Sequence, residues 1–234
     1  MTSRFFYLSL VCLAVITSCS KVQDFTVSGT VKGLKKGTLY LQKIKDSTLV
    51  NLDSLTVNGD PNFKFHTELK EPQILYLHLD KKDGSIYNDR IIFFAEPGEM
   101  NITTTLKGFD RKASITGSQN QVRWTQFEKI NKQFNITNIN LMQSSFKAQK
   151  NGRLETVSKY RDSIKTLQQR RYRYIGNFAI TNKEYAIAPY LVLTQIPDAS
   201  TSYLDTIYKS FPPKNQQSIY GKQLAKILQN RSKK

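Results

Sequence analysis

Cysteine and histidine are scarce in this 234-residue sequence, which holds two of each. Two cysteines are too few for a disulfide scaffold, and with only two histidines they are too few for a conventional structural zinc site. The 11 glycines and 7 prolines are also too few for a collagenous or low-complexity chain. The hydrophobic fraction of 39% and the aromatic fraction of 11% are large enough for a core, which excludes wholesale disorder.

The sequence also lacks the common catalytic motifs. No nucleophile-elbow sequence accompanies His66 or His78, and no phosphate loop of the Gly-x-x-x-x-Gly-Lys type occurs. Glu96 and Glu99 flank a Pro-Gly turn; a glycosidase-like pair would have to converge in a cleft, so we interpret them as a solvated loop. We therefore expect no enzymatic activity, no cofactor and no metal site, with both histidines as ordinary strand residues.

No apolar run in the sequence reaches the roughly 20 residues that a membrane-spanning helix needs. The run from Phe5 to Ile16 follows a single cation at the extreme N-terminus, which is typical of a secretory signal. The run ends in Ile-Thr-Ser before Cys19, and this ending resembles the bacterial lipobox. The resemblance implies that residues 1–18 are a lipoprotein signal peptide and that Cys19 carries the lipid. Ordinary signal cleavage nearby is the alternative.

Lipidation of Cys19 would leave the mature chain without a free thiol, because Cys12 lies in the removed segment. Several acyl chains would anchor the protein stably in a membrane, where a single chain would not. Ser20 and Lys21 carry no acidic sorting signal, which favours the outer membrane with the protein facing the periplasm. The expected location is therefore the bacterial cell envelope.

Positive charge is distributed very unevenly along the chain, whose formal net charge is +17. Residues 19–106 hold 11 Lys and Arg against 11 Asp and Glu, whereas residues 107–234 hold 23 against 7. This asymmetry predicts that the second half meets an anionic surface or partner, or that it is simply well solvated.

Alternation of apolar and polar residues in the first half predicts short strands. Asn58-Gly59 between two such runs indicates a hairpin. Turn signals recur roughly every 8–12 residues, which predicts an antiparallel β-sandwich-like domain over residues 19–117. The strands are expected at residues 25–31, 38–44, 49–57, 63–68, 74–80, 86–95, 100–106 and 113–116.

The second half, residues 118–234, is expected to be a basic helical segment, which makes the whole chain an α+β protein. Ser118 or Asn120 can cap the first helix. We expect a break or kink at residues 135–140, which are rich in Asn and β-branched side chains. An apolar stripe from Leu154 to Phe178 predicts one long helix. Shorter helices are expected at residues 141–150, 185–195, 202–211 and around 220–228.

Arg170, Arg171 and Arg173 alternate with tyrosines along the predicted long helix. Such interleaving suggests nucleic-acid contact in a cytosolic protein, but an exported lipoprotein rarely meets nucleic acid, so we expect no nucleic-acid partner. One interpretation is a solvated helix face whose tyrosines pack inward. The other is contact with an anionic surface, such as phospholipid headgroups, lipopolysaccharide phosphates or an acidic partner.

Several short segments of the first half carry a family resemblance: residues 25–29, 37–41, 53–54, 62–65 and 93–99. These segments resemble a domain of unknown function found on bacterial lipoproteins, where it often precedes a thioredoxin-like thiol–disulfide oxidoreductase domain. The helical segment resembles the same proteins in Ser202-Tyr203 and in residues 220–224. The redox domain with its Cys-x-x-Cys motif does not appear in this sequence, so no redox residue carries over.

Two functional hypotheses follow from the sequence. The first is a lipid-anchored, non-catalytic envelope module that binds a partner or ligand. The second, implied by the resemblance, is an accessory or docking subunit for a separate thioredoxin-like oxidoreductase.

Overall fold

The computed structural model describes residues 23–81 and 89–232, so both cysteines and the signal segment lie outside the described residues. The first half of the chain forms two four-stranded sheets, with strand orders β4-β1-β7-β8 and β3-β2-β5-β6. The eight predicted strands and the α+β fold class are confirmed, except that residues 86–88 of the strand predicted at 86–95 lie outside the described residues. The strands are β1 Gln23–Lys32, β2 Lys36–Lys45, β3 Thr48–Asn58, β4 Asn62–Leu69, β5 Gln73–Asp80, β6 Asp89–Ala95, β7 Gly98–Thr105 and β8 Ser114–Thr116.

Alternating side chains build the core between the two sheets. In β4, Phe63 and Phe65 are buried while Lys64 and His66 face solvent, because successive strand residues point to opposite faces. Apolar residues of both sheets meet in one cluster, which is the first hydrophobic core. Its largest fully buried members are Phe25, Phe65, Phe93, Phe109, Leu34, Leu39, Leu41, Leu69, Leu75 and Leu77.

One strand pair departs from the expected antiparallel arrangement. β1 pairs with β4 antiparallel but with β7 parallel, in a register that runs from Phe25 opposite Gly98 to Lys32 opposite Thr105. A glycine is required within this pair, because a Cβ atom built on Gly29 would lie 1.8 Å from the carbonyl oxygen of Ile102.

The hairpin predicted at Asn58-Gly59 is wrong. β3 and β4, on either side of this turn, belong to different sheets, so the turn carries the chain from one layer of the sandwich to the other. The tight hairpin in this region joins β2 to β3 at Asp46 and Ser47, whose φ angles of 49° and 67° are positive. Local turn chemistry indicates a reversal of the chain, but it does not specify which strands pair across it.

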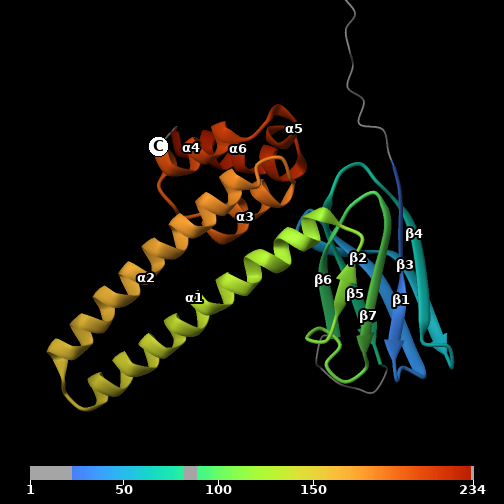
Figure 1. Ribbon diagram of the computed structural model, residues 1–234, viewed down its shortest axis with the longest axis horizontal. Coiled ribbons are helices and arrows are strands. Elements are labelled where there is room, and N and C mark those ends of the chain that lie inside the picture. The colour runs from blue at the N-terminus through green and yellow to red at the C-terminus, as the bar shows by residue number, and fades with distance from the viewer. Residues whose placement is uncertain (1–22, 82–88, 233–234) are drawn as a thin grey trace, which may run out of the picture.

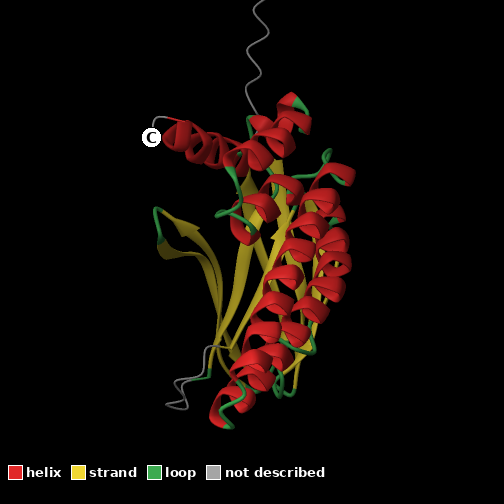
Figure 2. Cartoon of the chain, turned by 90° about the vertical axis from the view of Figure 1, so that its left-hand side faces the viewer, coloured by secondary structure: helices red, strands yellow, loops and turns green. Residues whose placement is uncertain are grey.

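Helices form the rest of the described chain. In Figure 1 the α1–α2 hairpin projects from one end of the sandwich, with α3 to α6 grouped near the base of the hairpin. Figure 2 shows these helices in front of the sandwich. None of the described helices is both long and apolar enough to cross a bilayer. The helices are α1 Gln119–Lys150, α2 Leu154–Thr181, α3 Ile187–Gln195, α4 Thr201–Ser210, α5 Pro213–Gln216 and α6 Ile219–Ser232.

The predicted break at residues 135–140 is also wrong, since α1 runs without interruption for 32 residues. Within the segment, the Thr137 hydroxyl donates to the carbonyl oxygen of Gln133 at 2.8 Å, one helical turn earlier. Because α2 packs along α1, tertiary contacts outweigh the low helical propensity of this Asn-rich stretch.

The predicted apolar stripe of the second long helix is wrong at Leu154. Its side chain is 75% exposed, although we expected it to pack with the other stripe residues. Leu154 is the first residue of α2, whereas α1 already ends at Lys150. Near the turn at Gly152 there is thus no facing helix to cover it.

A second hydrophobic core joins the helices to the sandwich. It contains Ile74 and Phe94 from the outer face of the β3-β2-β5-β6 sheet together with apolar residues of the helices. The rings of Trp124, Tyr190 and Tyr220 form T-shaped contacts with Phe94, with centroids 6.3, 5.6 and 6.1 Å away. This cluster, which we call the junction cluster, holds the base of the hairpin against the sheet.

Candidate interaction surface

The start of α1 is fixed by hydrogen bonds that satisfy its free backbone amides. The Ser118 hydroxyl accepts from the Gln121 amide at 2.9 Å, as predicted for a helix cap. The carboxylate of Glu96, from the turn between β6 and β7, accepts from the Gln119 amide and from the Asn120 side chain. Glu96 is therefore a helix cap and not the solvated loop residue that we expected.

Further polar contacts attach the helices to the sandwich. Gln121 Oε1 accepts from the amide of Phe94 and the Tyr220 hydroxyl oxygen accepts from the amide of Ile74, both at 2.8 Å. Glu71, from the β4–β5 loop, accepts from the first amide of α6 at 2.9 Å. Two sandwich glutamates thus each stabilise a helix N-terminus, where negative charge is favoured.

A cleft of about 770 Å³ lies at this junction. Lys70, Lys214 and Lys222 line it, together with Glu71 and Glu96, which already serve as helix caps. Glu184 lines the cleft as well, whereas the carboxylates of Glu71 and Glu96 are both engaged by backbone amides.

The tyrosines of the junction cluster are proton-bearing at neutral pH. Burial raises the pKa of Tyr190 to about 12, and it also raises the pKa of Tyr220. A hydroxyl used as a general base or nucleophile would need the opposite shift. We therefore assign these side chains to packing and hydrogen bonding.

The three arginines singled out in the sequence do not form one patch. Arg171 points inward: its Nε atom donates to Asn131 Oδ1 at 2.9 Å and its Nη2 atom to Gln195 Oε1 at 2.6 Å. Arg170 and Arg173 are both exposed. Residues one or two apart on a helix point in different directions, so Arg171 ties α2 to α1 and α3 while its neighbours remain in solvent.

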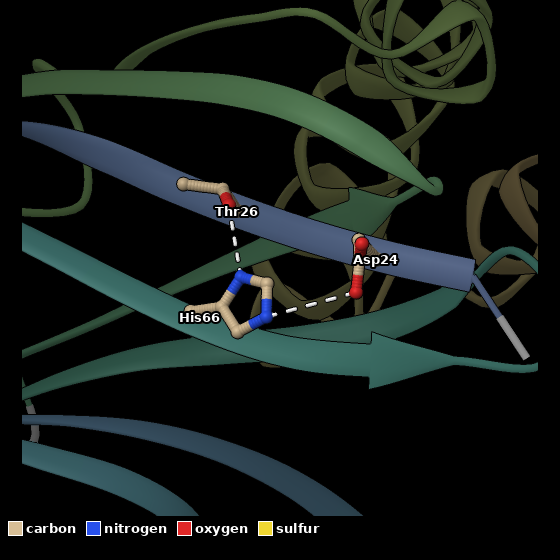
Figure 3. A network of polar contacts seen from close by, with 3 residues as sticks. All are labelled: Asp24, Thr26 and His66. Carbon is tan, nitrogen blue, oxygen red and sulfur yellow. Dashed lines mark hydrogen bonds and ion pairs between the residues drawn. The ribbon is translucent and has the colours of Figure 1, made fainter.

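Figure 3 shows the contacts of His66 on the exposed face of β4. Its Nδ1 atom lies 3.2 Å from the Thr26 hydroxyl, and its Nε2 atom lies 3.7 Å from Asp24. His78 stacks on Tyr40 with a centroid distance of 5.9 Å. The described part of the chain contains no group of three or more His, Cys, Asp or Glu side chains placed to hold a metal ion.

The outer half of the hairpin exposes apolar side chains that sequence reasoning did not identify as a surface. Ile139, Met142, Phe146 and Leu154 are 53, 56, 71 and 75% exposed. Residues 134–170 also carry seven Lys and Arg against two Asp and Glu. Exposed apolar side chains among like charges are typical of a surface that binds a partner. A helical wheel of the first long helix would have shown Ile139, Met142 and Phe146 outside its inward stripe.

Comparison with known proteins yields one family. The model of a domain of unknown function, DUF4369, matches residues 25–124. The match covers the sandwich and the beginning of α1, up to Trp124 of the junction cluster. No curated protein and no solved structure gives a significant match.

Proposed function

We propose that this protein is a lipid-anchored module of the bacterial cell envelope that acts by binding rather than by catalysis. Its binding element is the α1–α2 hairpin, and its partner presents an acidic surface. The observation that carries the proposal is the hairpin itself, which combines seven cations and two carboxylates over residues 134–170 with exposed apolar side chains. Charge complementarity of this kind favours fast encounter and selects the partner.

The arrangement of the two ends supports this role. Cys19 lies four residues before the start of β1, so the chain can separate them by at most about 14 Å. β1 begins beside the turn that caps α1, because Phe25 is opposite Gly98 and Glu96 contacts Gln119. From there α1 extends about 48 Å, and Figure 1 shows its far end at the opposite side of the molecule from the start of β1. An anchor at Cys19 would leave the hairpin tip reaching away from the membrane.

The anchor is tested by metabolic labelling with a fatty-acid analogue in cells that express the full chain. Labelling and recovery in the membrane fraction are expected in the wild type and in Cys12→Ser, and both should be lost in Cys19→Ala. Labelling that survives Cys19→Ala would contradict the lipoprotein assignment.

Binding is tested by co-purification from detergent-solubilised membranes. A hairpin variant with Lys147, Lys150 and Lys159 changed to Glu should lose partners that the wild type retains at low salt. The matched control changes Lys43, Lys45 and Lys64 of the sandwich to Glu and should retain them. Equal recovery with both variants, or recovery that does not respond to salt, would contradict a charge-driven hairpin surface.

A second candidate partner is a separate thioredoxin-like oxidoreductase. It is supported by the match of residues 25–124 to the domain of unknown function that the sequence resemblance had indicated. The purified mature chain should not itself reduce the disulfides of insulin. If the oxidoreductase is the partner, adding this protein should change the rate at which a thioredoxin-like lipoprotein from the same cell reduces insulin. An unchanged rate would remove this candidate.

A further inference from the structure

One side of the α1–α2 hairpin is a groove that the protein fills with its own helix at the base and leaves open towards the tip. At the base, Arg171 bonds to Asn131 of α1 and to Gln195, the last residue of α3. Beside it, the Tyr172 hydroxyl donates to Asp198, just beyond α3, at 2.6 Å. α3 therefore ends where the groove becomes free.

Beyond this point the groove has a volume of about 380 Å³. Phe134, Met142, Ile164 and Leu167 line it, and Arg171 closes its inner end. Phe146 lies one helical turn past Met142 on the same side of α1 and is 71% exposed. Asn135, Asn138 and Gln168 also line the groove. Its open part therefore combines apolar side chains with amides and extends towards the tip of the hairpin.

The carboxylate of Asp198 lies at the base of the groove, whereas the charges beside its open part, towards the tip, are positive. Arg161, Lys165 and Gln168 precede Tyr172 by eleven, seven and four residues, so all three share its face of α2. Gln168 indeed donates to the Tyr172 hydroxyl at 3.2 Å. Neither Arg161 nor Lys165 forms an ion pair within the described residues. The carboxylates of α2 lie elsewhere: Glu155 pairs with Lys159, and Asp162 lines the groove on the other side.

We infer that this groove binds an acidic amphipathic helix of another protein, an inference that rests on the proposed binding function and names its partner. The shape argument comes from the protein's own α3, which shows that a helix fits between α1 and α2 at the base. The incoming helix continues the line of α3, places apolar residues against Phe134, Met142 and Leu167, and directs carboxylates towards Arg161 and Lys165. Amphipathic helices bind apolar grooves in this way through anchors three and four residues apart.

Charge and position decide against two other occupants. A second copy of this chain would bring two hairpins of the same positive charge together, which is unfavourable. A bilayer that held the Cys19 anchor would lie at the start of β1, whereas the open groove lies towards the tip of a helix about 48 Å long. A helix with negative charge satisfies both constraints.

The inference is tested by site-specific photo-cross-linking in cells that express the full chain. p-Benzoylphenylalanine replaces Met142 in the groove, and in the control it replaces Thr137, which lines the opposite side of the hairpin. Mass spectrometry then identifies the cross-linked molecule. We expect the Met142 position alone to capture an acidic, amphipathic segment of another protein. Capture of phospholipid or of a second copy of this chain, or equal capture from both positions, overturns the assignment.

Affinity measurements with a synthetic peptide of the captured segment complete the test. Arg161→Glu with Lys165→Glu should weaken binding about tenfold or more, whereas Lys43→Glu with Lys45→Glu in β2, outside the hairpin, should leave it within a factor of about two. Equal losses overturn the groove assignment. If co-purification still depends on the hairpin lysines while the groove experiments fail, the proposed function stands and only the groove is excluded.

Discussion

Individual polar residues at the junction form specific hydrogen bonds. The effect of removing each hydrogen bond on the free energy of unfolding should be measurable by a single substitution. Several of the donors are backbone amides that a side chain from the other half of the molecule satisfies. Ile74 is an instance, because its buried amide donates to the Tyr220 hydroxyl oxygen 146 residues away. A buried donor without a partner costs more free energy than an ordinary hydrogen bond contributes.

Tyr220→Phe should therefore lower the free energy of unfolding by about 1–3 kcal/mol, although it removes only one oxygen atom. The ring remains to pack against Phe94, so the substitution removes only the hydrogen bond from the Ile74 amide. Urea unfolding of the two proteins measures the difference. Tyr208→Phe is the matched control, because its hydroxyl bonds to none of the described residues, and its effect should be within about 0.5 kcal/mol. Equal effects of the two changes would contradict the assignment.

Arg171 and Arg170 form a natural pair for comparison, since the same substitution at adjacent positions removes different contacts. Arg171→Leu leaves the oxygen of Asn131, a residue only 4% exposed, without its donor. We expect a loss of about 1–3 kcal/mol in unfolding free energy. Arg170→Leu, on the exposed face, should change it by about 0.5 kcal/mol or less. Thermal unfolding followed by circular dichroism distinguishes the two, and similar melting temperatures would be the contradicting result.

At the scale of elements, close approaches between backbones fix how the short helices stack. A Cβ atom built on Gly221 in α6 would lie 2.0 Å from the carbonyl oxygen of Asn215 in α5. The sequence motif over residues 220–224 thus has two structural explanations, a tyrosine oxygen that reaches the sheet and a glycine that allows two helices to touch.

Gly221→Ala should consequently destabilise the protein even though alanine is the better helix former by about 1 kcal/mol. The overlap with a backbone oxygen cannot be relieved by rotating a side chain, and we expect a net loss of about 1–3 kcal/mol. For a chain of this size each kcal/mol lowers the melting temperature by roughly 2–4 °C. Gln223→Ala, exposed on the same helix, should be neutral or slightly stabilising. A stabilised Gly221→Ala protein would show that α5 and α6 are further apart.

At the scale of the whole molecule, tyrosines pack against the second hydrophobic core, which joins the helices to the sandwich. Their burial makes the stability of the protein fall at alkaline pH. Burial raises the pKa of Tyr190 from 10.0 to about 12. Above pH 10 the unfolded chain loses this proton while the folded protein retains it. The contribution of Tyr190 to the free energy of unfolding is therefore fully present below pH 10 and falls as the pH rises towards 12. One such group changes the free energy of unfolding by at most about 1.4 kcal/mol per pH unit.

We therefore expect wild-type stability to decline above pH 10 and to decline less steeply in Tyr190→Phe. The fluorescence of Trp124, the single tryptophan of the sequence, follows the unfolding, because its ring contacts Tyr190 with a centroid distance of 5.8 Å. Denaturant titrations below and above pH 10 give the slopes. The same slope in both proteins would exclude Tyr190 as a source of the pH dependence.

The sequence predicts each strand and most helices because apolar periodicity reflects burial directly. The sequence does not predict which strands pair, because the partners of β1 lie far along the chain. Likewise, no local pattern distinguishes a hairpin at Asn58-Gly59 from a turn that passes between the two sheets. The kink expected at residues 135–140 did not occur because α2 supports that stretch. In the candidate surface, Arg170 and Arg171 belong to the same Arg-Tyr pattern of the sequence. Only the three-dimensional structure shows that Arg171 bonds to neighbouring helices while Arg170 is exposed to solvent. The exposure of Leu154 follows from where α1 ends, which periodicity does not show.

The parallel pairing of β1 with β7 has a consequence for biogenesis. During N-to-C synthesis β1 emerges first, yet one of its neighbours is complete only when residue 105 has been made. Until then β1 remains an open edge with apolar side chains, a template for intermolecular pairing. Such long-range pairing is also slow to form, because the intervening chain must close a large loop first. The order of synthesis thus fixes an interval in which β1 can aggregate, and a holdase chaperone that covers β1 would act in that interval.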